Sequence, residues 1–298
     1  MSHSIAPNSS PQERVNTAIN ADSTSQLLAA LESAASGSIT AFQELLNSSL
    51  AAAVSKGSVE LTKCILDEGA EVSALNIFDV ASRPSIALFE VLNSYGYNFN
   101  QQGAKDSIMK GRSLIYKVLH DATIVEWLIN HGASVDIGEE QYEVEARPPL
   151  LLETCAALGS VSSFKRLKDH GAKVPRRALH VAVGEAAALG ANPNNILQKD
   201  SVEIEDEKHK IDREEMLRYL VDDLRLDVNA LDCDEYKFKF WGPPLNYAAK
   251  EQNGGAVVHW LLGKGADPNN SSTGGMTTEQ MAKTYNAKEV LMILEDRK

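Results

Sequence analysis

The segment Asp67-Glu-Gly-Ala-Glu-Val72 decides the fold, because the chain repeats it. Close copies are Asn130-His-Gly-Ala-Ser-Val135, Asp169-His-Gly-Ala-Lys-Val174 and Gly263-Lys-Gly-Ala-Asp-Pro268, and a weaker copy is Tyr95-Gly-Tyr-Asn-Phe99. Each copy places a glycine just after an apolar stretch, where a left-handed residue closes the last turn of a helix without a steric penalty from a β-carbon. We therefore predict a series of helices that end at these five glycines.

The spacing of these segments indicates a tandem repeat. The five glycines are separated by 27, 36, 39 and 94 residues, and a degenerate copy without glycine, Arg225-Leu-Asp-Val-Asn229, divides the last interval into 54 and 40 residues. Gly57-Ser-Val59 and Gly159-Ser-Val161 each stand 12 residues before a helix-ending glycine and begin a run with apolar residues at helical spacing. An irregular period in this range is typical of a 33-residue helix-turn-helix repeat.

These segments resemble the ankyrin repeat, whose pattern runs Thr-Pro-Leu-His-x-Ala-Ala, Val-x-x-Leu-Leu and Gly-Ala-Asp-x-Asn. The copies that carry the resemblance are Pro243-Pro-Leu-Asn-Tyr-Ala-Ala249, Val257-Val-His-Trp-Leu-Leu262, Gly265-Ala-Asp-Pro-Asn269, Ala178-Leu-His-Val-Ala182 and Met276-Thr-Thr-Glu-Gln-Met-Ala282. The resemblance covers about residues 45–298. It implies an all-α fold, an ankyrin-repeat solenoid of about six to seven helix-turn-helix repeats with β-hairpin-like finger loops.

The rest of the chain follows from this architecture. Residues 1–22, rich in Ser, Asn and Pro, are expected to be a disordered leader before a solenoid over residues 23–298. We expect a helical N-terminal cap at 23–47 and a capping repeat at 276–298, because terminal repeats must cover an otherwise bare apolar face. A charged insert at 184–215 splits one repeat. Degenerate repeats with such insertions resemble those of many fungal ankyrin proteins.

The composition restricts the partners. The 298 residues carry 29 basic and 41 acidic side chains, a formal charge of −12, which disfavours direct binding to nucleic acid or an anionic membrane. The three cysteines are far apart and lack CxxC spacing, which argues against a disulfide framework and a zinc site. No signal peptide or membrane-spanning run is recognised. We expect a monomer of the cytoplasm or nucleus that uses neither a cofactor nor a metal.

The finger at residues 230–241 is the first candidate for a partner-binding site. Tyr236, Phe238 and Phe240 alternate with lysines and are followed by Trp241. If these rings face outward, they form an anchor of the kind that dominates interface energies. The alternative is that they fold onto the neighbouring repeat as part of the core, since exposed aromatic clusters are uncommon on monomers.

Two further residues complete the predicted partner-binding set. Tyr142 lies among four carboxylates in the finger at 137–147, which either recognises a basic partner segment or is a solvated loop. Asn246 lies on the first helix of the best repeat copy, where the solvent side of first helices contacts partners in this family. Insertions make both fingers longer than the repeat requires.

Few residues of the sequence are candidates for a catalytic role. His180 occupies the motif histidine of the repeat, which the resemblance assigns to hydrogen bonds within and between repeats, and no nearby nucleophile is specified. We predict that Cys64 and Cys155 are small buried residues of amphipathic helices. Cys233, between two aspartates on a finger, is expected to be exposed and a poor nucleophile. No catalytic residue is predicted.

Two functions of different classes remain open at this point. The leading hypothesis is an adaptor that binds another protein, with a regulatory version in which it acts as a transcriptional coregulator without touching DNA. The alternative is an unconventional enzyme or accessory protein of small-molecule biosynthesis, in which the insert and the long fingers roof a pocket. A closed apolar cavity with a few convergent polar groups would favour the alternative.

Overall fold

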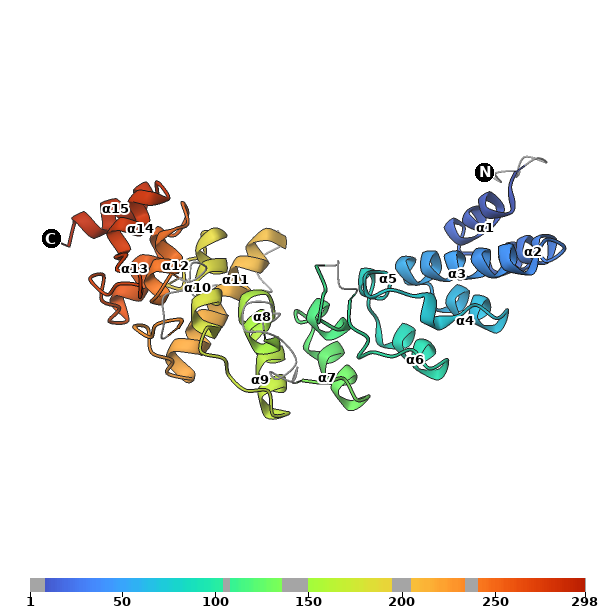
Figure 1. Cartoon of the computed structure of the whole chain (residues 1–298), viewed down its shortest axis with the longest axis horizontal. Coiled ribbons are helices and arrows are strands. Elements are labelled where there is room, and N and C mark those ends of the chain that lie inside the picture. The colour runs from blue at the N-terminus through green and yellow to red at the C-terminus, as the bar shows by residue number, and fades with distance from the viewer. Residues whose placement is uncertain (1–8, 104–107, 136–149, 195–204, 234–240, 298) are drawn as a thin grey trace. The chain divides into compact units, whose positions relative to one another are not determined.

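The computed structural model describes residues 9–103, 108–135, 150–194, 205–233 and 241–297 (Figure 1). The chain forms two compact units. Unit 1 comprises the residues up to Val118 together with Asn130–Ala133, and unit 2 comprises Leu119–Ile129 and the residues from Ser134 onward.

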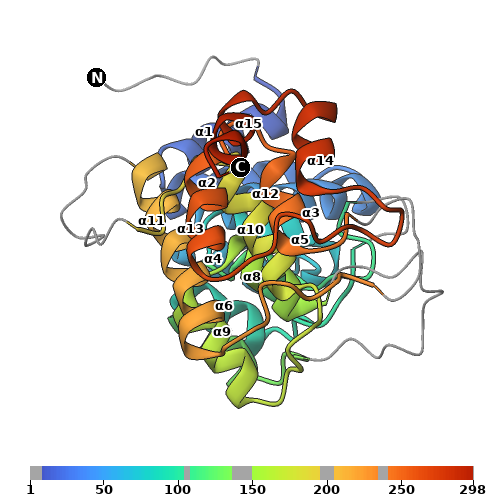
Figure 2. The same cartoon turned by 90° about the vertical axis from the view of Figure 1, so that its left-hand side faces the viewer.

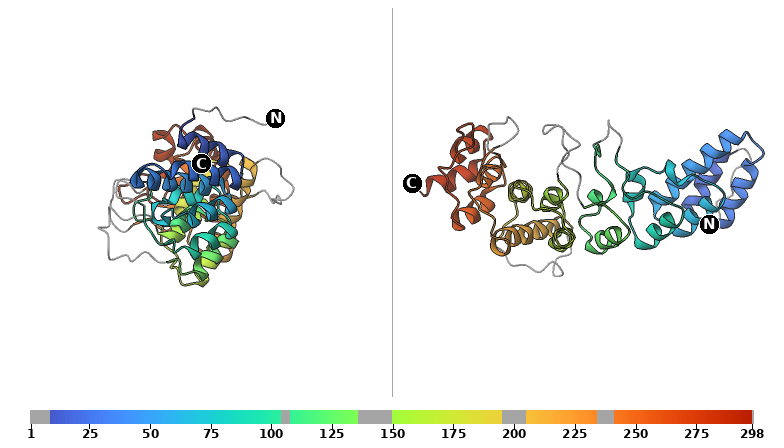
Figure 3. Two further views of the ribbon diagram at one scale, coloured as in Figure 1. Left: turned by 90° about the vertical axis from the view of Figure 1, so that its right-hand side faces the viewer. Right: turned by 60° about the horizontal axis from the view of Figure 1, so that its bottom comes forward.

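Unit 1 is helical. Its elements are α1 (Pro11–Asn20), α2 (Thr24–Ala34), α3 (Ile39–Lys56), α4 (Val59–Asp67), the 3-10 helix η1 (Val72–Ala74), α5 (Ile77–Ser82), α6 (Ile86–Ser94) and the 3-10 helix η2 (Leu114–Lys117). The first three helices pack together, and α3 also contacts α4 and α5 (Figure 3). The core consists mainly of small and branched apolar side chains, with Phe89 against Phe99 as one of its ring pairs.

Unit 2 consists of successive helix pairs. Its elements are α7 (Ala122–Asn130), α8 (Leu151–Leu158), α9 (Val161–Asp169), α10 (Ala178–Ala188), α11 (Glu205–Arg218), the π-helix η5 (Tyr219–Asp223), α12 (Pro244–Ala249), α13 (Gly255–Gly263), α14 (Thr278–Thr284) and α15 (Lys288–Glu295). The first helices α8, α10, α12 and α14 lie side by side in this order, and each packs on the second helix of its own pair (Figure 2).

Secondary structure other than helix is scarce in the described part of the chain. It contains no β-strand, and its only bridges are isolated ones at Gly103 with Lys110 and at Ser271 with Thr277. The second of these closes a finger between the last two repeats. None of the helices found among the described residues has the length and apolar character needed to cross a membrane.

The five glycines that predicted helix ends all adopt the left-handed conformation, with φ between 81° and 97°. The prediction is therefore confirmed at Gly69, Gly96, Gly132, Gly171 and Gly265. In the degenerate copy that lacks the glycine, Arg225 takes the left-handed conformation instead, with φ 55°. An L-residue is strained in this region by about 1–2 kcal/mol, so the repeat geometry is kept at a cost where the glycine is missing.

The first helix of unit 1 corrects the prediction of a disordered leader over residues 1–22. Residues Pro11–Asn20 form α1, which begins with a capping box in which Ser10 accepts from the Glu13 amide and the Glu13 carboxylate accepts from the Ser10 amide. Its apolar face, Val15, Ala18 and Ile19, is buried on α2 and α3. Three apolar residues at helical spacing are sufficient here because neighbouring helices cover them.

The charged insert at 184–215 is also more regular than its composition suggests. Its first residues finish α10 and its last eleven begin α11, so both helices of the split repeat are extended into the insert. Helix α11 buries Ile211, but also Arg213 and Glu214, which are 5% and 4% exposed. Two charged residues therefore replace apolar ones on the packed face of this helix.

Candidate functional site

The finger that ends at Trp241 is held at its base by one carboxylate. Asp232 is 4% exposed, and its Oδ2 accepts hydrogen bonds from the amides of Trp241 (2.9 Å) and Gly242 (3.1 Å) and from the hydroxyl of Tyr247 (2.7 Å). The Asp232 amide donates in turn to the Gly242 carbonyl at 3.2 Å. These bonds tie the two ends of the finger to each other and to α12. We call Asp232, Trp241, Gly242, Asn246 and Tyr247 the finger base.

Asn246 belongs to this structural network and corrects its prediction as a partner-binding residue. It is completely buried. Its Nδ2 donates to the carbonyls of Trp241 (2.8 Å) and Met276 (3.1 Å), and its Oδ1 accepts from the Thr278 hydroxyl at 2.9 Å. The amide therefore joins the finger to the next repeat. A side chain with no exposed surface and with both polar atoms bonded internally is not available to a partner.

Trp241 is the predicted anchor residue that the structure describes. Its ring forms a T-shaped pair with the Tyr247 ring, with centroids 5.0 Å apart and an interplanar angle of 89°, and Lys250 Nζ lies 4.9 Å from the Trp241 centroid. The indole is half-buried in this position, so it is neither a free anchor nor a core residue. Tyr142, Tyr236, Phe238 and Phe240, the other predicted aromatic residues of the set, lie outside the described residues.

His180 performs the structural role that the resemblance assigns to it. Its Nε2 lies 2.9 Å from the carbonyl oxygen of Ala230, which can only accept, so Nε2 carries the proton. This bond joins α10 to the start of the finger. The imidazole is 1% exposed, and burial lowers the pKa of His180, which keeps the ring neutral.

The remaining polar groups near the finger base are also engaged in structure. Arg177 Nη1 lies 2.9 Å from Glu153 Oε1, and this carboxylate is 4% exposed. Burial raises the pKa of Tyr247 far above its ordinary value, so the phenol stays protonated and donates to Asp232. A neutral imidazole, a protonated phenol and a carboxylate with three donors make a scaffold for the finger, and they do not form a nucleophile with its base.

The cysteines follow the prediction in part. Cys155 on α8 is buried, and burial raises the pKa of its thiol to about 12. Cys64 on α4 is half-buried, and burial raises the pKa of this thiol as well. Cys233, expected to be exposed, is instead buried beside the finger base. Within the described ranges, no group of three or more His, Cys, Asp or Glu side chains is placed to hold a metal ion.

The insert borders a cavity in unit 2 that sequence patterns did not reveal. Its volume is about 260 Å³, and its lining residues are His120, Ala157, Leu158, Glu185, Leu189, His209, Asp212 and Arg213. Sites for drug-sized molecules usually enclose about 300–1,000 Å³. The segments that the biosynthetic hypothesis places over a pocket include residues 137–147, 195–204 and 234–240, which lie outside the described residues, so that hypothesis stays a prediction.

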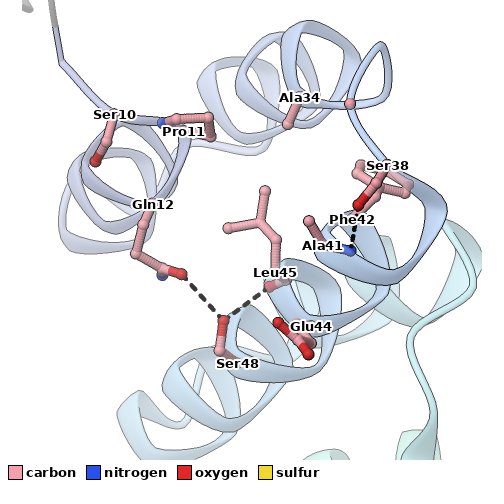
Figure 4. A pocket seen from close by; sticks show the side chains of 11 residues that line it. Ser10, Pro11, Gln12, Ala34, Ser38, Ala41, Phe42, Glu44, Leu45 and Ser48 are labelled. Atoms are coloured by element: carbon pink, nitrogen blue, oxygen red, sulfur yellow. Dashed lines mark hydrogen bonds between the residues drawn. The ribbon is translucent and has the colours of Figure 1, made fainter.

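A cavity of about 520 Å³ lies in unit 1 among α1, α2 and α3 (Figure 4). Leu45 points into it, and Ala34 and Ala41 add to its apolar wall. At its edge, the Ser48 hydroxyl lies 3.2 Å from Gln12 Oε1. The sequence prediction misses this cavity, because one of its walls is α1, a segment that the composition assigns to disorder.

Gly242 provides a direct test of how tightly the finger base is packed. It has φ 90°, and a β-carbon at this position would lie 2.5 Å from Ser272 Cα. Gly275 has φ 78° with no atom within 4 Å of such a β-carbon. Both Gly→Ala changes cost about 1–2 kcal/mol of left-handed strain. We expect the free energy of unfolding, measured in urea, to fall by about 1–3 kcal/mol more in Gly242→Ala than in Gly275→Ala, because the new β-carbon at position 242 would clash with backbone. Equal losses would contradict this packing.

The depressed pKa of His180 predicts a pH dependence. The neutral ring is favoured in the folded state, so its contribution to stability is complete above the ordinary pKa of about 6.5 and is lost as the pH falls below it. Between pH 7 and 5 we expect the wild type to lose up to about 1.4 kcal/mol per pH unit relative to His180→Gln.

The measurement is a series of urea unfolding curves of both proteins at each pH. Burial raises the pKa of Glu214, and that contribution is lost as the pH rises, opposite to the effect of His180. Both proteins retain Glu214, so the difference between them isolates the histidine. Parallel pH profiles would show that His180 does not resist protonation in the folded state.

Comparisons with known proteins bear on the fold. No family model and no curated protein matches the sequence. Among solved structures, the chain is similar to the crystal structure of the human ASB11 ankyrin repeat domain, with a TM-score of 0.53 and 17% sequence identity over 82% of this chain and 96% of that domain. At this identity the likeness concerns the fold alone. Together with the helix pairs and left-handed glycines, it identifies the architecture as an all-α array of ankyrin-type repeats.

Proposed function

We propose that this protein is an interaction module that binds another protein through the first helices and the finger of unit 2. Stacked repeats bury one continuous core and leave an extended surface, which such proteins commonly use for binding. The buried polar groups described above hold that surface in shape. The proposal does not involve a cofactor.

The observation that carries the proposal is the position of Trp241. Tryptophan is among the residues most enriched at the energetic centres of interfaces. Here the Trp241 ring is held by Tyr247 and Lys250, while the Asp232 and Asn246 bonds fix the backbone on both sides of it. A half-buried ring that is already ordered loses little conformational entropy when a partner covers it.

A finer version of the proposal is a regulatory role in which the protein binds a DNA-bound factor. The formal charge of −12 favours contact with DNA through a partner over direct contact. Electrophoretic mobility shifts of the isolated protein on duplex DNA test this version. Tight binding with a steep salt dependence would rule it out, because that behaviour belongs to a protein that contacts phosphates directly.

The interaction proposal is tested by purifying the tagged protein from its native cells beside two variants. Trp241→Ala removes the candidate anchor, and Tyr285→Ala, at a 42% exposed ring after α14, is the matched control. Circular dichroism and urea unfolding establish that both variants fold. We expect a partner that is retained by wild type and Tyr285→Ala and lost from Trp241→Ala. A partner retained equally by all three would move the binding site away from the finger base.

A further inference from the structure

Helix α10 carries a glycine in its interior, Gly184, which does not have a positive φ. Among the described residues, the one atom outside the helix that a β-carbon at Gly184 would meet within 4 Å is Tyr247 Cδ1, at 3.7 Å. That distance is an ordinary van der Waals contact, so alanine would fit. Glycine in place of alanine in a helix interior lowers the folding equilibrium constant roughly two- to fivefold. The free protein therefore loses stability at Gly184 without a gain in packing or backbone freedom among the described residues.

Gly184 lies beside the ring that holds Trp241. Its neighbour Tyr247 forms the T-shaped pair with Trp241, with centroids 5.0 Å apart. Val181 and Gly184 are half-buried and Ala188 is exposed, and the three share one face of α10 because they are three and four positions apart. We call Val181, Gly184, Ala188 and Tyr247 the glycine notch. Bare backbone at the centre of the notch lets a bound chain approach the helix more closely than any side chain would allow.

Two cations beside the glycine notch are already paired within the protein. Arg177 interacts with Tyr247, and its Nη1 lies 2.9 Å from Glu153 Oε1. Lys250 Nζ lies 4.9 Å from the centroid of the candidate anchor ring and forms an ion pair with Glu251. An acidic side chain of a partner would therefore have to compete with a carboxylate of the protein itself at both positions.

The notch itself contains no charged group. Its members are a glycine, an alanine, a valine and a phenol whose hydroxyl donates to Asp232. The exposed Glu185, which follows the central glycine, lines the cavity beside the insert together with Arg213, and so belongs to another side of α10. Burying a charge without a paired opposite charge is costly. The chemistry of the notch therefore favours an uncharged, apolar group.

We propose that the glycine notch receives an uncharged aliphatic side chain of the partner, next to the group that covers Trp241. This inference rests on the proposed function and adds a second contact, with its chemistry, to it. Gly184 is then a specificity-determining residue. The missing β-carbon costs stability in the free protein and allows close contact in the complex, a trade of stability for function.

A tethered probe tests the chemistry of the notch without the partner. Ala188→Cys, in a Cys64→Ser background, places a thiol one turn after Gly184. Side chains of a helix lean toward its N-terminus, so an adduct on this thiol covers Gly184. The other cysteines, Cys155 and Cys233, are buried. The protein is equilibrated with isopentyl thiol, mercaptoethanol and cysteamine and their disulfides, and mass spectrometry of the intact chain measures the fraction of each mixed disulfide.

We expect the isopentyl adduct at position 188 to be favoured over both polar adducts at least about fivefold more than at a reference thiol, because it buries aliphatic surface. The reference is Ser162→Cys, at an exposed position on α9. Adding Gly184→Ala should reduce this preference. The matched control is Gly263→Ala, at an exposed glycine of α13 where a β-carbon would meet no described atom within 4 Å. It should leave the preference unchanged.

The same two glycine variants are then compared with Trp241→Ala in the purification from native cells. We expect Gly184→Ala to raise the urea midpoint of the free protein and to reduce the amount of retained partner at least about tenfold, because the added methyl group holds the partner away from the helix. Gly263→Ala should retain the partner like wild type. A glycine with a purely structural role would not combine a gain in stability with a loss of binding.

Several outcomes would overturn the proposal. Equal adduct preferences at the two thiols would remove the notch, and a preference for cysteamine would show that Glu185 recruits a cation instead. A partner retained by Gly184→Ala but lost from Trp241→Ala would refute the notch and leave the proposed function intact, whereas a wild type that retains no partner would refute both. If the isopentyl preference appears only after residues 234–240 are replaced by a Gly-Ser linker, the occupant is a segment of the chain itself.

Discussion

Replacing Arg213 by methionine is expected to destabilise unit 2 by about 3 kcal/mol. The guanidinium is 5% exposed and donates to the Ala156, Ala157 and Gly159 carbonyls, so its loss leaves buried acceptors at the end of α8 without donors. Methionine keeps much of the side-chain volume, which limits the cavity left behind. The expected loss therefore comes mainly from unsatisfied carbonyl groups.

Tryptophan fluorescence in a urea titration measures this effect in unit 2 alone. The three tryptophans of the chain, Trp127, Trp241 and Trp260, all lie in that unit. The matched control is Arg166→Met, which removes an exposed guanidinium paired with Glu126 at 2.6 Å and should change stability by about 0.5 kcal/mol or less. If both variants lose the same small amount, Arg213 does not hold the insert helix onto α8.

Arg213 also explains why the sequence does not reveal the insert as part of a packed helix pair. A packed helix is usually recognised by apolar residues at helical spacing. In α11 the packed face includes Arg213 and Glu214 among its buried residues. The hydrophobic pattern is therefore interrupted at the position where hydrogen bonds join the helix to the end of α8. The carbonyls that accept from Arg213 lie more than fifty residues earlier in the chain. Such a contact depends on the completed fold and is not encoded in local sequence.

The repeat itself could be predicted because its signals are local. The residue that ends each of these helices takes the left-handed backbone conformation, which favours glycine. Gly69 and Gly171 adopt this conformation as predicted. His180 could likewise be assigned to a carbonyl bond from its place in the motif, and it bonds Ala230. The helix at Pro11–Asn20 also carries a local signal, since Ser10 and Glu13 form a capping-box pattern, although the composition of residues 1–22 indicates disorder.

Only part of the finger base could be predicted from the sequence, because some of its contacts join residues that are far apart in the chain. Trp241 is predicted from its residue type, which requires no structural information. The place of Asn246 on a first helix predicts a solvent-facing side chain, yet its amide donates to the Met276 carbonyl 30 residues away. No sequence pattern distinguishes Asp232 from the other acids of this finger, although its carboxylate organises the finger. Burial decides these roles, and burial is a property of the assembled repeats.

Replacing Asp232 by alanine is expected to destabilise unit 2 by about 4 kcal/mol, more than the loss expected for Arg213→Met. Three donors lose their acceptor at once, namely the amides of Trp241 and Gly242 and the Tyr247 hydroxyl. Each unsatisfied buried group costs about 1–3 kcal/mol. Water reaches the half-buried Trp241 end of the finger, so the full sum is not expected.

Two variants make the Asp232 measurement specific. Asp232→Asn keeps a side-chain oxygen as acceptor and should lose about 1 kcal/mol. Asp227→Ala, at an exposed turn where the carboxylate accepts only from the Asn229 amide among the described bonds, should stay within about 0.5 kcal/mol of wild type. In urea titrations followed by tryptophan fluorescence, a loss in Asp232→Ala no larger than in Asp227→Ala would show that the finger is held by other contacts. If Asp232→Asn is stable and still retains the partner captured through Trp241, the carboxylate acts as an acceptor that positions the finger, and its negative charge is not what the partner recognises.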